Sequence, residues 1–120
     1  FLVAYNVFLA SNDIRIAQKI ARQIRASSGC LPGVKALGLL VDGQAQVSMN
    51  LVDIQQAPIH TVFDEIVRLS AQEGVSVSHS ELIGLTPQEL MLQAAAHYLK
   101  LPAFSAANTI EGALARAALE

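Results

Sequence analysis

Residues 34–52, VKALGLLVDGQAQVSMNLV, carry the clearest structural signal of the chain. The first part, 34–41, is a nearly continuous apolar run that predicts a strand. Asp42-Gly43 then favours a tight turn, because Gly accepts a positive φ and Asp tolerates one. Residues 44–52 alternate polar and apolar side chains, which is the period of a strand. The stretch therefore predicts two antiparallel strands joined by a hairpin.

The second strand of this hairpin has two different faces. Gln46, Ser48 and Asn50 alternate with apolar neighbours, so one face carries amides and a hydroxyl without charge. Such groups suit a surface that becomes desolvated, because they can satisfy hydrogen bonds without the cost of burying a charge. Two interpretations remain open from the residues alone: a surface for a ligand or partner, and an ordinary solvated sheet face.

Hydrophobic periodicity and capping residues predict the remaining elements. In order, the prediction is a strand over 2–9, a helix from Ile14 to Ser27-Ser28-Gly29, the strands 34–41 and 44–52, a helix from Pro58 to Gly74, a strand over 75–82, a helix that Thr86-Pro87-Gln88-Glu89 opens as a capping box, and an Ala-rich helix over 106–118.

The first six elements match the split βαβ, or ferredoxin-like, pattern. We therefore predict an α+β fold with a four-stranded antiparallel sheet, helices on one face, extra C-terminal helices and a bare second face. The bare face is expected to carry Asn6, the polar residues of 44–52 and the serines of the last strand, such as Ser80. His79 alternates with Val75 and Val77, which places it on the helix-packed side.

Composition limits the number of domains and the classes of function that this chain can have. The chain has 120 residues, 52% of them hydrophobic and 15% charged, which predicts one domain over 1–120 with some surface covered by a partner. A net charge of −2 gives no reason to expect that the chain binds nucleic acid or an anionic membrane.

The sequence also predicts where the protein is located. No apolar run is long enough to cross a membrane, and Cys30 is the only cysteine, so a cytoplasmic protein with an inert thiol is expected. The missing initiator Met and the final Leu119-Glu120 suggest an excised domain.

Residues that could act in catalysis or bind a metal do not form a recognisable motif in the sequence. His60, His79 and His97 have no evident acid or base partner, and no metal-ligand spacing or nucleotide-binding motif occurs. The first helix carries a basic stripe that fits either a solvated helix face or a surface for an anionic ligand or partner: Arg15, Lys19, Arg22 and Arg25. Asp53 has two open roles, capping the turn before Pro58 or orienting a ligand.

Four segments together resemble the C-terminal subdomain of the glutamate formiminotransferase family, and they occur in the same order and with similar spacing along nearly the whole chain. They are residues 2–6 (LVAYN), 31–38 (LPGVKALG), 45–53 (AQVSMNLVD) and 80–87 (SELIGLTP).

This resemblance implies a ferredoxin-like subdomain whose sheet stacks on that of a related N-terminal subdomain, with tetrahydrofolate in a tunnel between them. The family transfers a formimino group from N-formiminoglutamate to tetrahydrofolate in histidine degradation, without a metal, and its catalytic histidine belongs to the N-terminal subdomain. His79 stands where relatives often have Gly. By the same resemblance the residues of the tunnel or of the contact between subdomains are Asn6, Gln46, Ser48, Asn50 and Ser80, with Asp53 near the edge.

Two hypotheses follow. The first is the non-catalytic, folate-contacting half of the transferase, inactive by itself. The alternative is a free-standing module that uses the bare sheet face to bind a small ligand or to dimerise. In either case a neutral face built for contact predicts self-association of the isolated chain.

Overall fold

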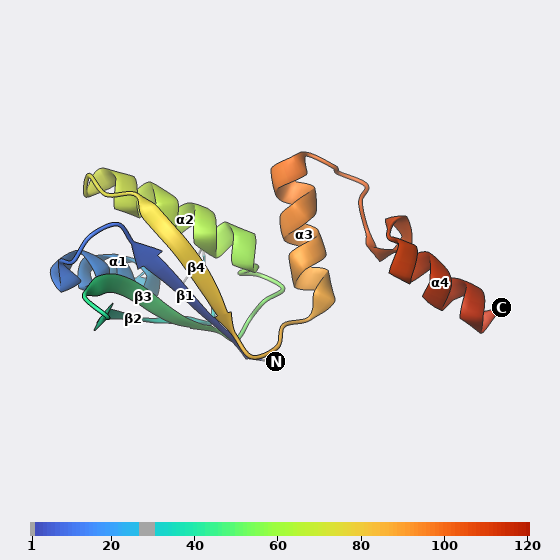
Figure 1. The fold of residues 1–120 in the computed structure, drawn as a ribbon, viewed down its shortest axis with the longest axis horizontal. Helices are drawn as coiled ribbons and strands as arrows, with labels where there is room; N and C mark the ends of the chain where they lie inside the picture. The colour runs from blue at the N-terminus through green and yellow to red at the C-terminus, as the bar shows by residue number, and fades with distance from the viewer. Residues whose placement is uncertain (1, 27–30) are drawn as a thin grey trace. The chain divides into compact units, whose positions relative to one another are not determined.

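The computed structural model describes residues 2–26 and 31–120. These residues divide into two compact units, Phe1–Leu85 and Thr86–Glu120 (Figure 1). Cys30 and the predicted helix end at Ser27-Ser28-Gly29 lie outside the described residues.

The first unit has the predicted order of strands and helices. Its elements are β1 (Val3–Leu9), α1 (Ile14–Ala26), β2 (Val34–Val41), β3 (Gln44–Leu51), α2 (Ile59–Gln72) and β4 (Val77–Ile83). The strands form one four-stranded antiparallel sheet in the order β2-β3-β1-β4. This is the ferredoxin-like α+β arrangement, so the predicted fold class is confirmed.

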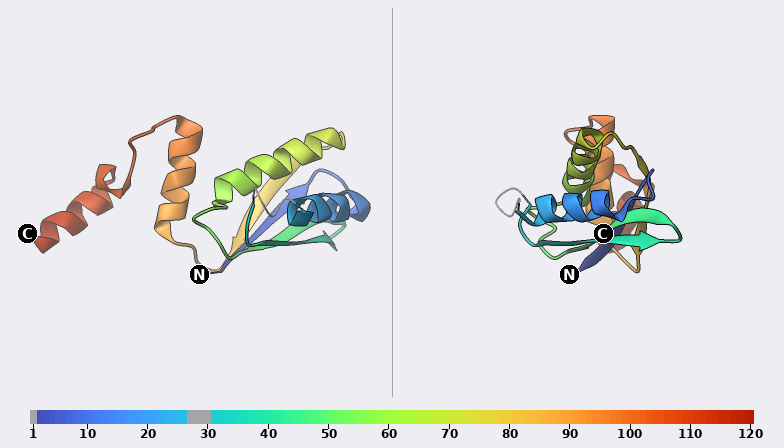
Figure 2. Two further views of the ribbon diagram at one scale, coloured as in Figure 1. Left: turned by 180° about the vertical axis from the view of Figure 1, so that it is seen from behind. Right: turned by 90° about the vertical axis from the view of Figure 1, so that its left-hand side faces the viewer.

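Both helices of this unit lie on one face of the sheet (Figures 1 and 2). The core lies between the two layers, where apolar residues of alternate strand positions meet the apolar stripe of each helix. Its fully buried members include Val3, Val7, Leu9, Val47 and Leu51 of the sheet, Ala17, Ile20 and Ile24 of α1, and Val62 and Ile66 of α2.

Local sequence explains where these elements begin and turn. Asp42 and Gly43 have φ angles of 50° and 76° between the paired residues Val41 and Gln44, which confirms the two-residue hairpin. The Asp13 carboxylate accepts the backbone N–H of Arg15 at 3.0 Å and thereby caps the start of α1.

The second unit consists of α3 (Gln88–Leu99), a short 3-10 helix, η1 (Ala106–Asn108), and α4 (Ile110–Leu119). The predicted capping box at its start is wrong. Pro87 takes the N-cap position in an extended conformation, no side chain caps the helix, and the Thr86 hydroxyl donates to the Pro87 carbonyl at 3.4 Å. The helix begins one residue too late for Thr86 to reach the N–H groups of its first turn.

The close approach of α1 to β2 depends on a glycine. A Cβ atom built on Gly38 would lie 2.4 Å from the backbone nitrogen of Gln18 and 2.6 Å from the carbonyl carbon of Ala17. Because both are backbone atoms, the helix itself would have to move. We expect Gly38→Ala to lower the free energy of unfolding by about 2–3 kcal/mol in a denaturant titration.

Gly43→Ala is the matched control. Its added methyl group meets nothing within 4 Å, and the variant bears only the strain of a φ of 76°, about 1 kcal/mol. Equal losses in the two variants would contradict the close packing of α1 on β2.

Candidate functional site

The face of the sheet opposite α1 and α2, here called the open face, is defined by strand register. Directly paired residues of antiparallel strands point to the same side, and every second residue shares that side. Along β2, β3, β1 and β4 the open face therefore consists of three rows: Leu39, Gln46, Phe8, His79; Leu37, Ser48, Asn6, Glu81; and Lys35, Asn50, Ala4, Ile83.

The centre of the open face is polar and uncharged, as the alternation in residues 44–52 predicts. Asn6, Gln46, Ser48 and Asn50 all lie on it, away from the helices. Their exposure differs: Asn50 is exposed, Asn6 and Ser48 are half-buried, and Gln46 retains only 3% of its accessible surface. The open face thus offers amide and hydroxyl groups that are already partly desolvated.

A bulge in β4 changes the side of the sheet on which its side chains lie. Phe8 pairs with His79 and Leu9 with Val77, so Ser78 has no partner on β1. The extra residue reverses the alternation beyond it. His79 therefore lies on the open face, and the prediction that it faces the helices is wrong. Ser80 pairs with Val7 on the helix side, so its expected place on the bare face is also wrong.

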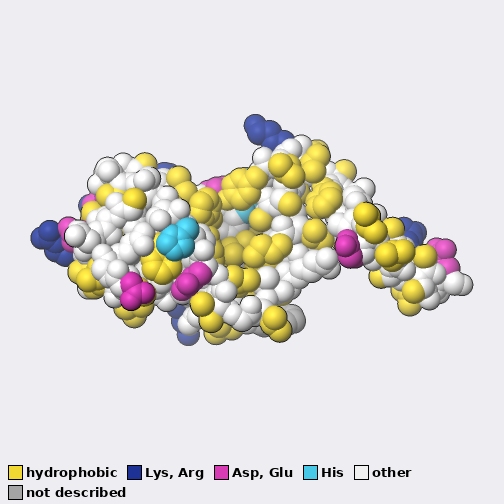
Figure 3. Space-filling view, in the orientation of Figure 1, with side chains coloured by type: hydrophobic (Ala, Val, Ile, Leu, Met, Phe, Trp, Pro, Cys, Tyr) yellow, Lys and Arg dark blue, Asp and Glu magenta, His cyan; other side chains and the backbone are white. Residues whose placement is uncertain are grey.

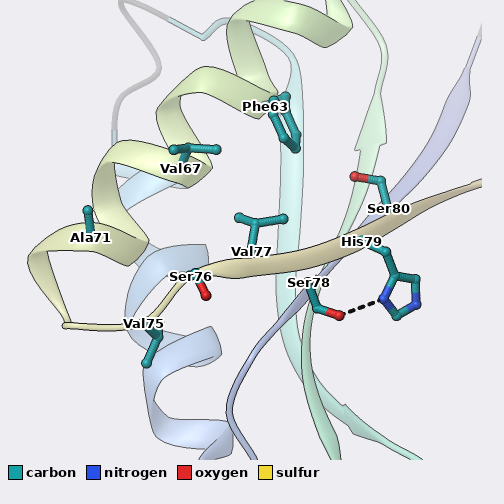
Figure 4. A pocket seen from close by; sticks show the side chains of 9 residues that line it. All are labelled: Phe63, Val67, Ala71, Val75, Ser76, Val77, Ser78, His79 and Ser80. Atoms are coloured by element: carbon teal, nitrogen blue, oxygen red, sulfur yellow. Dashed lines mark hydrogen bonds between the residues drawn. The ribbon is translucent and has the colours of Figure 1, made fainter.

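His79 is held in a defined position at the edge of the open face. Its ring stacks on Phe8 with centroids 4.4 Å apart and an interplanar angle of 7°. Its Nδ1 lies 2.9 Å from the Ser78 hydroxyl, in a hydrogen bond whose direction depends on the tautomer. Figure 4 shows the Ser78 and His79 side chains on the same side of β4, which is the effect of the bulge.

Ser80 instead lies on the helix side of the sheet, exposed on the edge strand β4. Its hydroxyl lies 2.9 Å from the Tyr5 hydroxyl, and Tyr5 is only 5% exposed. Burial raises the pKa of the Tyr5 phenol, and the hydrogen bond to Ser80 lowers it by less. Beside this pair, a mostly apolar groove of about 520 Å³ runs between α2 and β4, with Phe63 and Val67 on its helix side (Figure 4).

Charged and apolar side chains lie at the margins of the open face. Glu81 accepts a hydrogen bond from the Asn6 amide nitrogen at 3.0 Å. A histidine and an acidic side chain are exposed together over β4 in Figure 3, and both His79 and Glu81 are exposed residues of that strand. Leu37 and Ile83 are 58% and 54% exposed at opposite edges. The neutral polar side chains of β3 and β1 lie between these two edges.

The other predicted candidates lie elsewhere. Asp53 accepts the backbone N–H of Gln56 at 3.2 Å through its side chain and that of Ala57 at 2.8 Å through its carbonyl, so it does cap the turn before Pro58. His60 belongs to α2, and His97 stacks edge-on against Tyr98 in α3 with ring centroids 4.9 Å apart.

Most of the basic stripe of α1 is engaged in contacts within the first unit. Arg15 pairs with Asp13 at 2.9 Å and Lys19 with Glu73 at 3.0 Å, while Arg25 donates to the carbonyl of Ala36. These contacts agree with the predicted solvated helix face and require no anionic ligand.

Residues 2–26 and 31–120 hold neither a candidate metal site nor a membrane-spanning helix. Within these ranges, no group of three or more His, Cys, Asp or Glu side chains is placed to hold a metal ion. No helix in the described part of the chain is long and apolar enough to cross a membrane.

Comparison with known proteins gives a consistent match. Residues 4–119 match the formiminotransferase domain family. The chain is 39% identical over 121 residues to glutamate formimidoyltransferase of Thermoplasma acidophilum, a match that covers 98% of this chain and 40% of that protein.

Two other relatives are similar. Identity is 39% over 105 residues to glutamate formimidoyltransferase of Streptococcus pyogenes, with 86% of this chain and 35% of that protein covered. Identity is 36% over 107 residues to formimidoyltransferase-cyclodeaminase of Gallus gallus, and this match covers 83% of the present chain and 20% of that protein. The chain thus spans at most 40% of the length of these relatives.

The buried Tyr5 phenol makes stability depend on alkaline pH. Because its pKa is raised above 10.0 in the folded chain, its stabilising effect is present below the unfolded pKa and is lost as the pH rises through the folded value. In a Tyr98→Phe background, where Tyr5 is the only tyrosine, absorbance titration should give a midpoint above 10.0 that returns toward 10.0 in denaturant. A midpoint at or below 10.0 in the folded chain would contradict the burial of this group.

Proposed function

The chain belongs to the formiminotransferase family, and we propose from this membership that it is the folate-contacting part of an enzyme that moves a formimino group from N-formiminoglutamate to tetrahydrofolate in histidine degradation. The observation that carries the proposal is the open face, whose centre holds neutral amide and hydroxyl groups and no charged side chain. A cytoplasmic location fits this metabolic role and is part of the same proposal.

The open face suits a pterin ring for two physical reasons. Asn6, Gln46, Ser48 and Asn50 can donate to and accept from the amide-like edge of the ring without the desolvation cost of a full charge. The flat sheet, extended by the stacked rings of Phe8 and His79, offers a platform for an aromatic ligand. Asp53, directly after β3, would lie at the edge of this surface, whereas Ser80 is left out because it faces α2.

Proton transfer would come from outside these residues. We propose that the part of the relatives not matched by this chain includes an N-terminal subdomain, which covers the open face and supplies the catalytic histidine. The present chain would orient tetrahydrofolate as co-substrate and exclude water, without a metal cofactor.

A second candidate function is a free-standing binding or dimerisation module. The exposed Leu37 and Ile83 at the margins of the open face favour it, because two copies could cover each other there. We accordingly propose that the isolated chain self-associates, which sedimentation at rising chain concentration tests: a monomer at every concentration would refute it.

The transferase proposal predicts activity in the full-length protein that contains these residues. Purified full-length protein should transfer the formimino group from N-formiminoglutamate to tetrahydrofolate, while the 120-residue chain alone should not. Transfer by the chain alone would remove the need for a second subdomain, and no transfer by the full-length protein would contradict the proposed function.

Loss of one central amide should weaken folate binding specifically. We expect Asn50→Leu in the full-length protein to reduce tetrahydrofolate affinity by about 1–3 kcal/mol, because a buried hydrogen-bonding group of the ligand loses its partner. Calorimetry measures the affinity, and thermal denaturation should show little change, since Asn50 is exposed within this chain. Gln72→Leu, a similar change on α2, is the control; equal effects of both variants would refute the placement of folate on the open face.

A further inference from the structure

Glu81 provides a negative charge on the open face that no basic side chain of the described residues neutralises. It lies in the middle row beside Asn6, and within the described residues no Lys or Arg forms an ion pair with it. Lys35, the other charged residue of the open face, is on β2 at the opposite edge. Three strand spacings separate the two strands, roughly 14 Å.

The Glu81 carboxylate is also oriented. The Asn6 amide nitrogen donates to its Oε1 at 3.0 Å, and no other hydrogen bond to this carboxylate is made by the described residues. Each carboxylate oxygen has two lone pairs, so both oxygens can still accept a donor from a ligand. A carboxylate with both oxygens available is the usual partner for two parallel N–H groups.

A second polar group on the same face lacks a partner. Gln46 is only 3% exposed, lies between Leu39 and Phe8 in the adjacent row, and makes no hydrogen bond from its amide to another described residue. Its amide atoms still reach the surface, because they are not among the buried polar atoms without a partner, and a ligand that covers the face would have to hydrogen-bond them. Glu81, Asn6 and Gln46 therefore belong to one incomplete hydrogen-bonding surface.

We propose that Glu81, oriented by Asn6, binds a planar N–C–N edge of a substrate through two parallel N–H groups. This inference rests on the proposed transferase function and adds a ligand-binding residue to it. Two substrates of that reaction offer such an edge: the cationic formamidine group of N-formiminoglutamate, and the 2-amino and N3–H groups of the pterin.

The Glu81→Gln substitution tests the contribution of the negative charge, because it removes the charge and keeps the shape of the side chain. The Gln Oε1 atom can still accept from Asn6, and the side chain keeps nearly the same volume, so folding should be preserved. The substituted amide presents one donor and one acceptor where the carboxylate presents two acceptors. The ligand edge thus loses one hydrogen bond and the opposite charge. Glu65→Gln on α2, which loses only an exposed ion pair with Arg68, is the matched control.

The experiment measures kcat and KM for each substrate in the full-length protein and in both variants. We expect Glu81→Gln to raise the KM for one substrate by about tenfold or more, with kcat within about threefold and the Glu65→Gln values unchanged. A higher KM for N-formiminoglutamate alone assigns Glu81 to the formamidine group, and a higher KM for tetrahydrofolate alone assigns it to the pterin. Unchanged KM values for both substrates would overturn the inference.

Inactive full-length protein would contradict the proposed function without deciding this inference. In that case calorimetry with each compound on the unaltered protein and on Glu81→Gln decides it. The inference holds if one compound binds and loses about tenfold in affinity in the variant. It is overturned if neither compound binds or if the affinities agree.

Discussion

Helices cover the sheet on one face only, and the other features of the fold follow from this arrangement. Because α1 and α2 both pack on the same face, the alternate residues of all four strands must point away from the core. Gly38 lets α1 approach β2 closely, and the apolar residues of the inner positions supply the driving force for this packing. The chemistry of the open face is thus fixed by the register that buries the core.

Sequence patterns predicted those parts of the fold that depend on local signals. The Asp42-Gly43 turn set the pairing of β2 with β3, and the alternation of Gln46, Ser48 and Asn50 identified their common face. The bulge at Ser78 left no such signal, because serine occupies every second position from Ser76 to Ser80 without interruption. That single extra residue moved His79 onto the open face and Ser80 off it. The missing capping box at Thr86 reflects a helix start that is shifted by one residue.

The same bulge explains which residues of the open face the sequence did not reveal. It brings the His79 ring onto this face, where it stacks on Phe8. Glu81 becomes part of the open face only when its pairing with Asn6 is known. The result is a surface with a neutral polar centre, a flat aromatic pair at one edge and a single oriented carboxylate.

The central claim is that the open face contacts the folate co-substrate in the full-length enzyme. A crystal structure of the full-length protein with tetrahydrofolate bound tests it most directly. The account predicts the pterin ring against the open face, within hydrogen-bond distance of at least one of Asn6, Gln46, Ser48 and Asn50. A ring bound away from this sheet, with the open face still in contact with bulk water, would contradict it.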